Sequence, residues 1–142
     1  MARQPEIVAD ASVVCKWYLP ERGTEQALAL RQAHIDGRVR LVAPDLLCYE
    51  VANALRYHRG MNAGELREAM GFFFDEQVGL IVPTRRDLST AAQVALERSL
   101  TVYDATYAVL AERRRCPLVT DNTKLLRGSE RATPLASWAP EG

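Results

Sequence analysis

The sequence predicts a three-layer α/β/α fold around a mainly parallel sheet of four or five strands. Short apolar runs that suit buried strands alternate along the chain with longer helical patterns, which is the order typical of βαβ units. The chain has 142 residues, 48% of them hydrophobic and 25% charged, as in an ordinary globular domain. No internal repeat, linker or low-complexity segment interrupts this pattern, so we expect one domain over residues 1–142.

Five short stretches are predicted to be strands because each is an apolar run bounded by residues that favour turns. In chain order they are residues 7–9, 41–43, 80–82, 117–120 and, as a small fifth strand, 135–138. In a parallel sheet the carboxyl ends of the strands lie at one edge, where ligands bind. The residues that follow each strand are therefore the first places to look for a site.

The segments between the strands are predicted to be helices because they carry apolar residues at helical spacing. In chain order they are residues 13–18, 24–35, 45–59, 62–77, 87–99 and 101–115, with a short helix containing Leu125 and Leu126. Thr24, Asn62 and Thr101 are the expected N-caps, and Gly37, Gly60 and Gly79 lie at helix ends. The expected inward-facing residues of the helix at 87–99 are Leu88, Ala91, Ala92, Ala95 and Leu96. Phe73 and Phe74 are expected in the core, with Phe72 exposed and available to a partner.

The overall charge and the cysteine pattern exclude several classes of protein. Eighteen basic and eighteen acidic residues balance, so no global positive field indicates nucleic-acid binding, although a bound metal can supply positive charge locally. Three cysteines, an odd number, argue against a disulfide framework. Neither a signal peptide nor an apolar run of roughly 20 residues is present, so we expect a cytoplasmic protein without membrane contact.

Four carboxylates fall near the predicted carboxyl edge of the sheet. Asp10 and Asp121 directly follow the first and fourth strands, and either acid alone has the simpler explanation of a helix cap. Glu50 lies in the second turn of the helix after the second strand and has no basic partner at i+3 or i+4. Asp104 lies in the first turn of the helix before the fourth strand, where it also suits the helix dipole.

Asp104 is predicted to lie on a packed face of its helix rather than in solvent, because its neighbours on that face are small. Ala108 and Ala111 lie at i+4 and i+7 from it, a stripe that suits close packing rather than solvent. An acid on a packed face must be paired, protonated or bound to a metal. Carboxylates without a neighbouring histidine or cysteine suit Mg²⁺ or Mn²⁺, and such ions promote in-line attack of water on a phosphodiester. The residues therefore predict a metal–carboxylate site.

Four blocks of the sequence resemble, in order and spacing, those of PIN-domain proteins and most closely the VapC-type toxins of prokaryotic toxin–antitoxin modules. The blocks are DASVVCKW at 10–17, PDLL at 44–47 with EVANAL at 50–55, TVYDA at 101–105 and LVTD at 118–121. The resemblance implies a metal-dependent endoribonuclease that cleaves RNA, forms a homodimer and is inhibited by a small VapB-like antitoxin. It implies that Asp10 and Asp104 are the principal Mg²⁺ or Mn²⁺ ligands and that Glu50 is a further ligand or a base-orienting acid.

The chain departs from the family pattern at the fourth acid. The family usually has an acid two residues after the threonine that ends the last inner strand, where this chain has Asn122 and carries its aspartate one residue earlier, at Asp121. Either Asp121 turns inward, or Asn122 supplies a neutral oxygen, or a second ion is bound weakly. Ser12 and Asn53 are expected to donate hydrogen bonds to neighbouring acids.

The same residues are compatible with two alternative functions, and three basic residues nearby are candidates for phosphate contacts. An aspartyl-phosphate phosphatase would use Asp10 as nucleophile, but those enzymes usually carry a second aspartate where this chain has Ser12. A degenerate PIN domain would bind RNA or a protein without cutting. Lys16, Lys124 and Arg127 follow the acid-bearing turns and are candidates for phosphate contacts, with ordinary solvated cations as the alternative.

Overall fold

The computed structural model describes residues 4–140 and contains one parallel sheet with strand order β3-β2-β1-β4-β5. All four pairings between neighbouring strands are parallel. The strands are β1 Glu6–Ala9, β2 Arg40–Pro44, β3 Gly79–Ile81, β4 Leu118–Thr120 and β5 Ala132–Pro134. The predicted parallel sheet is confirmed.

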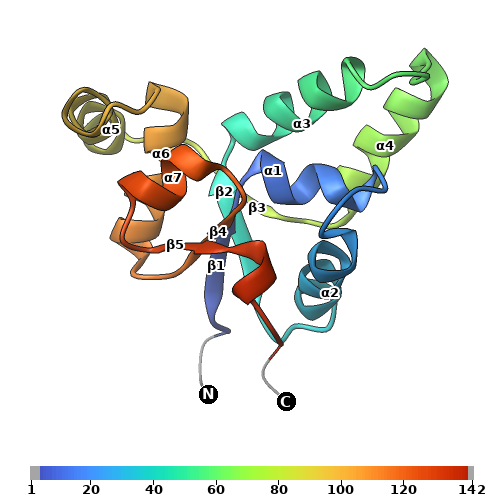
Figure 1. Cartoon of the computed structure of the whole chain (residues 1–142), viewed down its shortest axis with the longest axis horizontal. Helices are drawn as coiled ribbons and strands as arrows, with labels where there is room; N and C mark the ends of the chain where they lie inside the picture. The colour runs from blue at the N-terminus through green and yellow to red at the C-terminus, as the bar shows by residue number, and fades with distance from the viewer. Residues whose placement is uncertain (1–3, 141–142) are drawn as a thin grey trace.

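Helices cover both faces of the sheet, so the predicted three layers are confirmed. The described helices are α1 Ala11–Val14, α2 Thr24–Ile35, α3 Leu46–Arg56, α4 Ala63–Asp75, α5 Arg85–Arg98, α6 Val102–Arg114 and α7 Thr123–Gly128, with 3-10 turns at Cys15–Trp17 and Leu135–Ser137. Helices α1 to α4 lie on one side of the sheet and α5 to α7 on the other (Figure 1). Within the described residues no helix has the length and apolar character that crossing a bilayer requires.

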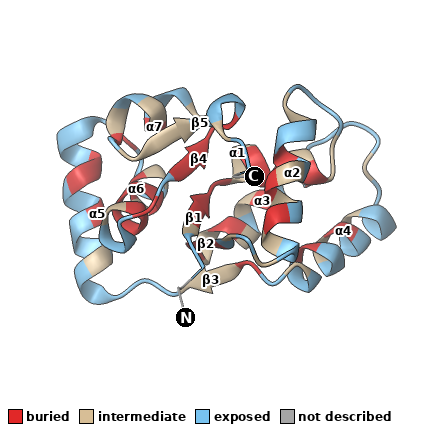
Figure 2. Cartoon of the chain, turned by 90° about the horizontal axis from the view of Figure 1, so that it is seen from below, coloured by how far each residue is buried: buried red, intermediate tan, exposed pale blue. Residues whose placement is uncertain are grey.

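The core lies on both faces of the three inner strands, where buried residues concentrate (Figure 2). Helix α6 packs directly on β1, β2 and β4. Its face toward the sheet is the small stripe Ala105, Ala108 and Ala111, and all three residues are fully buried. Small side chains let the axis of α6 approach the sheet closely, which brings its first turn to the carboxyl edge of the strands.

The inward face of the helix at 87–99 was predicted correctly at Ala91 and Ala95 and wrongly at Leu88, Ala92 and Leu96. Helix α5 begins two residues earlier, at Arg85, and buries Ala91, Val94 and Ala95. Leu88 is 46% exposed, Leu96 is 86% exposed and Ala92 is also exposed. The physical reason is that α5 packs mainly on α6, so only one narrow stripe of its residues is buried.

Three smaller predictions were also wrong. The fifth strand is Ala132–Pro134, because β4 pairs with that segment, while 135–137 forms a 3-10 turn that buries Leu135. Phe74 is exposed like Phe72, and only Phe73 reaches the core. Gly23, with a φ of 90°, precedes α2 in the N-cap position, and Thr24 is the first helical residue. The caps at Asn62 and Thr101 are confirmed, since each side chain accepts a backbone hydrogen bond.

The strand order places a topological switch point beside β1. From β1 the chain passes to β2 and β3 on one side, and then returns to β4 and β5 on the other. The connections that follow two neighbouring strands run to opposite sides at such a point. They therefore diverge and open a crevice beyond the carboxyl ends of the strands. Asp10 and Asp121 follow the two strands that border this point.

Candidate metal centre

Asp10 lies at the switch point and is only 5% exposed. Its Oδ1 accepts a hydrogen bond of 2.6 Å from the Ser12 hydroxyl, and its Oδ2 accepts one of 2.6 Å from the Thr120 hydroxyl. Asp10 occupies the N-cap position of α1, but no side-chain capping hydrogen bond to that helix is made, so both oxygens are oriented by hydroxyls instead. Burial raises the pKa of Asp10, the two hydroxyls and the Val13 backbone N–H lower it, and the charge of Asp104 raises it. The carboxylate is therefore oriented rigidly at an energetic cost.

Glu50 projects from the second turn of α3 and is half-buried. Its Oε1 accepts a hydrogen bond of 2.5 Å from the hydroxyl of Tyr107, a residue of α6 that is 1% exposed. Burial raises the pKa of Glu50, the Tyr107 bond lowers it, and the charges of Asp10 and Asp104 raise it. One oxygen of Glu50 is thus held in place by a buried phenol.

Asp104 is the third residue of α6, as its spacing from Thr101 predicts. Its backbone N–H donates to the Thr101 hydroxyl over 3.0 Å, so the cap is made by the threonine and leaves the Asp104 carboxylate free of that task. The Oδ1 of Asp104 accepts a bond of 3.3 Å from the amide nitrogen of Asn122. Its charge acts on both Asp10 and Glu50.

These three acids are not neutralised by basic residues of the described chain. The ion pairs within residues 4–140 involve neither Asp10 nor Glu50 nor Asp104. Like charges that share a partly buried site repel and disfavour one another's ionisation. Asp10 at the end of β1 and Glu50 on α3 are both influenced by the charge of Asp104 on α6, and none of the three forms an ion pair among the described residues.

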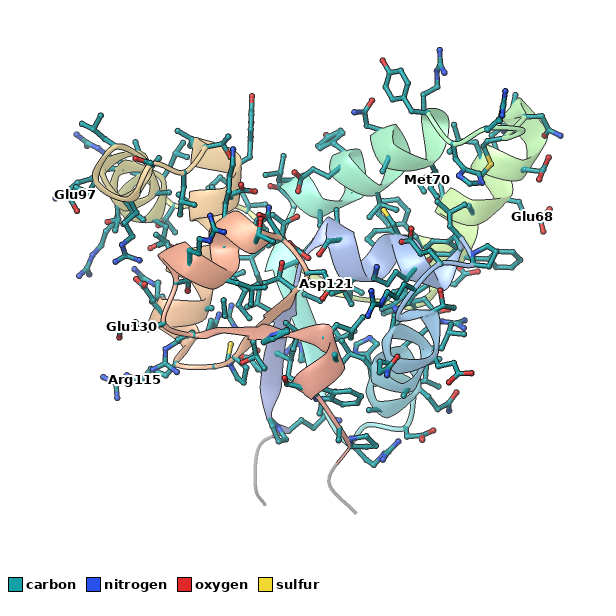
Figure 3. The ribbon with its side chains drawn as sticks, viewed as in Figure 1. Glu68, Met70, Glu97, Arg115, Asp121 and Glu130 are labelled. Atoms are coloured by element: carbon teal, nitrogen blue, oxygen red, sulfur yellow. The ribbon has the colours of Figure 1, made fainter. Side chains whose placement is uncertain are left out.

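Asp121 is not brought to this group. Its Oδ2 lies 3.5 Å from the Lys16 ammonium, and its Oδ1 accepts a bond of 3.3 Å from the Leu135 backbone N–H. Figure 3 shows Asp121 in the middle of the molecule, at the end of the sheet. Its backbone N–H donates to the Ser12 hydroxyl over 2.9 Å, so the main chain rather than the carboxylate of Asp121 contacts the site.

Asn122 occupies the position of the family's fourth acid, but its oxygen is engaged elsewhere. The Oδ1 accepts from the backbone N–H groups of Lys124 and Leu125, at 2.9 and 3.4 Å, and so caps α7. The amide nitrogen is the atom that reaches Asp104. As oriented, Asn122 supplies the group with a hydrogen-bond donor and not with a neutral oxygen ligand.

The expected supporting donors divide in the same way. Ser12 does contact Asp10, whereas Asn53 lies on the exposed part of α3 and shows no side-chain hydrogen bond to Glu50 among the described residues. Sequence reasoning missed Thr120 and Tyr107. Tyr107 is three residues after Asp104 and so shares its helical face, which was the available signal. Nothing local indicated that Thr120 pairs with a residue 110 positions away.

The chemistry of the donor set fits Mg²⁺ or Mn²⁺. The donors are carboxylate oxygens, which hard divalent cations prefer, and a bound cation would compensate their charge. Within residues 4–140 no group of three or more Asp, Glu, His or Cys side chains converges closely enough to hold an ion by itself. Mg²⁺ does not require such a cage, because it usually keeps several waters and is held by one or two carboxylates together with substrate phosphates.

The strain on Asp10 predicts the pH dependence of stability in the metal-free protein. A pKa raised above its unfolded value of 3.8 means that the folded state binds the proton more tightly, so stability falls as pH rises from about 4 through the folded pKa. Asp10→Asn removes this effect, and in EDTA at pH 7 we expect its Tm to exceed that of the unsubstituted protein by about 3 °C, or about 1 kcal/mol. The difference should shrink toward pH 4, as measured by thermal unfolding.

The exposed Glu68 provides the matched control for this measurement, since Glu68→Gln also neutralises one acid. We expect no comparable gain in its Tm. An Asp10→Asn protein that is no more stable than the unsubstituted protein at pH 7 would show that the carboxylate is not strained.

Comparison with known proteins agrees with this geometry. The PIN domain family model matches residues 7–130. Ribonuclease VapC3 of Pyrobaculum aerophilum is 36% identical over 128 residues, covering 84% of this chain and 92% of that protein.

Two crystal structures share the fold. PAE2754 from Pyrobaculum aerophilum superimposes with a TM-score of 0.68 at 24% identity, covering 94% of this chain and 91% of that chain. FitAcB from Neisseria gonorrhoeae superimposes with a TM-score of 0.67 at 13% identity, covering 93% of this chain and 99% of that chain. With a family match across most of its length and a VapC relative above 30% identity, the chain belongs to the PIN-domain family, as a VapC-type member.

Proposed function

We propose that this protein is a metal-dependent endoribonuclease, the toxin of a VapBC-type pair, and that it acts in the cytoplasm as one PIN domain over residues 1–142. The observation that carries the proposal is the group Asp10, Glu50 and Asp104. Asp10 lies at the switch point of the sheet, the charge of Asp104 raises the pKa of both Asp10 and Glu50, and none of the three carboxylates forms an ion pair among the described residues. The VapC relative, named as a ribonuclease, supports RNA as the substrate.

In the proposed site, Asp10 and Asp104 would hold Mg²⁺ or Mn²⁺. When bound, such an ion neutralises charge on the phosphodiester and makes water more acidic. Ser12 and Thr120 keep both oxygens of Asp10 in one orientation, so no reorganisation is needed when the substrate arrives.

Glu50 is the proposed proton acceptor or further ligand. Tyr107 occupies its Oε1, and its Oε2 has no hydrogen-bond partner among the described residues, so that oxygen is available to orient a water molecule. Partial burial and two neighbouring acids raise the pKa of Glu50 toward the range in which a carboxylate can take a proton. Glu50 takes a proton from the water, whose oxygen bonds to phosphorus as the opposite P–O bond breaks in line, and the leaving oxygen takes up a proton from solvent.

We further propose a VapB-like antitoxin and a homodimer as partners, on the family resemblance. Large apolar residues that stand exposed on or beside α3 and α4 support a protein-binding role for this part of the surface. They are Tyr49, Tyr57, Phe72 and Phe74. Co-purification with the product of a neighbouring small open reading frame tests the antitoxin.

Calorimetric titration with Mn²⁺ tests the metal centre itself. We expect binding tighter than the millimolar range and a loss of affinity of at least about tenfold in Asp10→Asn, because the most rigid carboxylate is removed. Asp121→Asn is the matched control: it neutralises a neighbouring aspartate whose carboxylate turns to Lys16, and it should bind Mn²⁺ almost as well as the unsubstituted protein. Absence of binding below the millimolar range would favour a PIN domain that binds RNA or protein without cutting.

A further inference from the structure

A cleft of about 1010 Å³ opens beside α7, away from the three acids. It is lined by the last turns of α5 and α6, by α7 and by the start of β5. Figure 3 shows Glu130, one of its lining residues, on the flank of the molecule beneath α7 and apart from Asp121. None of the residues assigned to the metal centre lines it.

The cleft is more basic than acidic, although the chain as a whole is neutral. Its basic side chains are Arg98, Lys124, Arg127 and Arg131, against two acids, Glu112 and Glu130. Arg98 is occupied, because it donates to Glu112 over 2.9 Å and to the Gly128 carbonyl over 3.1 Å. The other three cations form no ion pair within residues 4–140. A local excess of unpaired cations in a neutral protein indicates an anionic ligand.

A buried hydroxyl in the wall of the cleft supports the same conclusion independently. Ser129 lines the cleft, is 5% exposed, and its Oγ has no hydrogen-bond partner in the described structure. A buried hydroxyl without a partner is costly and rare in folded proteins. The hydroxyl lies below the surface of the cleft wall, so this wall would have to shift slightly for a phosphate oxygen to accept the hydrogen bond that the hydroxyl can donate.

Helix α7 connects the cleft with the proposed catalytic centre. Its cap, Asn122, contacts Asp104, while Lys124 and Arg127 lie three residues apart and so face the same side of the helix. The six residues of α7 span roughly 9 Å at 1.5 Å per residue. At the rise of roughly 3.4 Å per nucleotide of a strand stacked as in a duplex, that length corresponds to about three nucleotides.

We propose that this cleft, hereafter the α7 cleft, binds backbone phosphates of the RNA strand a few nucleotides from the cleaved bond. The inference rests on the proposed ribonuclease function for the identity of its ligand. Lys124, Arg127 and Arg131 neutralise the phosphates, and Ser129 donates to a phosphate oxygen. Such contacts hold the strand in register without reading its bases.

The test measures RNA binding without cleavage, by fluorescence anisotropy of a short mixed-sequence single-stranded RNA in EDTA. In the variant Lys124→Gln/Arg127→Gln/Arg131→Gln we expect Kd to rise roughly 10- to 100-fold, with a salt slope smaller by about 2, since each phosphate contributes roughly 0.7. The control Arg59→Gln/Arg67→Gln/Arg86→Gln removes the same charge from exposed positions outside the cleft. Equal losses in both triple variants would overturn the proposal.

Ser129→Ala separates an effect on RNA binding from an effect on folding, because RNA affinity should fall while Tm does not. Removing the unpartnered hydroxyl should leave Tm unchanged or raise it, while RNA affinity falls about threefold through the lost hydrogen bond. Unchanged RNA affinity in Ser129→Ala would show that the proposed contact between this hydroxyl and RNA is wrong. Polyglutamate is the competing probe: a triple variant that loses polyglutamate affinity and keeps RNA affinity would overturn the proposal in favour of an acidic protein segment.

The two proposals fail in distinguishable ways. If Mn²⁺ stimulates RNA cleavage and the triple variant still binds RNA as the unsubstituted protein does, the proposal that the α7 cleft binds RNA is wrong, and the proposed nuclease function is supported. If no cleavage occurs but the triple variant alone loses RNA binding, the cleft stands as the RNA site of a protein that does not cut.

Discussion

Replacing Asp104 with asparagine is expected to reduce Mn²⁺-dependent RNA cleavage by roughly 100- to 1,000-fold, the range seen when a centre loses a group that stabilises transition-state charge. Asparagine keeps the size of the side chain and the backbone bond to Thr101, and its own oxygen can still accept from Asn122. The fold should therefore survive, with a free energy of unfolding within about 0.5 kcal/mol of that of the unsubstituted protein. Cleavage of total RNA, followed with and without Mn²⁺, is the measurement, and growth arrest on expression is its cellular counterpart.

Asp87 offers a matched control for this substitution. It is the third residue of α5, and its backbone N–H donates 3.1 Å to the Thr84 hydroxyl, just as that of Asp104 donates to Thr101. Asp87→Asn removes an acid from the same helical position and breaks a surface pair with Arg113, which contributes at most about 1 kcal/mol. We expect full cleavage activity from it. Retained activity in Asp104→Asn, or equal losses in both variants, would reduce Asp104 to a helix-dipole residue.

The second large effect is expected from Ala108→Leu, which should lower the free energy of unfolding by about 3 kcal/mol. Ala108 lies in the middle of the small stripe of α6 and is fully buried against the sheet. A leucine side chain has no room there without moving the helix, because protein interiors are close-packed. A moved helix also displaces Asp104, so Mn²⁺ affinity should fall together with stability. Urea denaturation and calorimetry measure the two effects.

Ala92→Leu is the matched control, since Ala92 lies on the exposed face of the neighbouring helix α5. The same increase in side-chain volume there should change stability by no more than about 0.5 kcal/mol. If Ala108→Leu unfolds at the same urea concentration as Ala92→Leu, α6 is not pressed onto the sheet, and the argument that its alanines position Asp104 is wrong.

The parallel sheet, its helical layers and the positions of the acids were predictable because they depend on local patterns. Apolar runs of strand length, helical periodicity and capping residues such as Asn62 and Thr101 are encoded by neighbours within a few residues. The placement of Asp10 after a strand and of Asp104 in the first turn of a helix follows from the same local information. Parallel strands then bring the residues at their carboxyl ends to one edge of the sheet.

The burial pattern of α5 was less predictable, because it depends on what the helix packs against. Leu88 and Leu96 are apolar like core residues, but α5 packs mainly on α6, and both leucines remain exposed. The fifth strand moved for a similar reason. Pairing with β4 selected Ala132–Pro134 over the more apolar residues that follow.

The sequence by itself therefore determined the fold class, the family and the three acids at the carboxyl edge of the sheet. Only the tertiary structure decided which side chains support them. The Thr120 hydroxyl that orients Asp10 and the Tyr107 hydroxyl that holds Glu50 come from positions 110 and 57 residues away, beyond any local pattern. The tertiary structure also decided that Asp121 turns to Lys16 while Asn122 caps α7. The reason is that neighbouring residues at the end of a strand point in opposite directions, so a shift of one residue exchanges their roles.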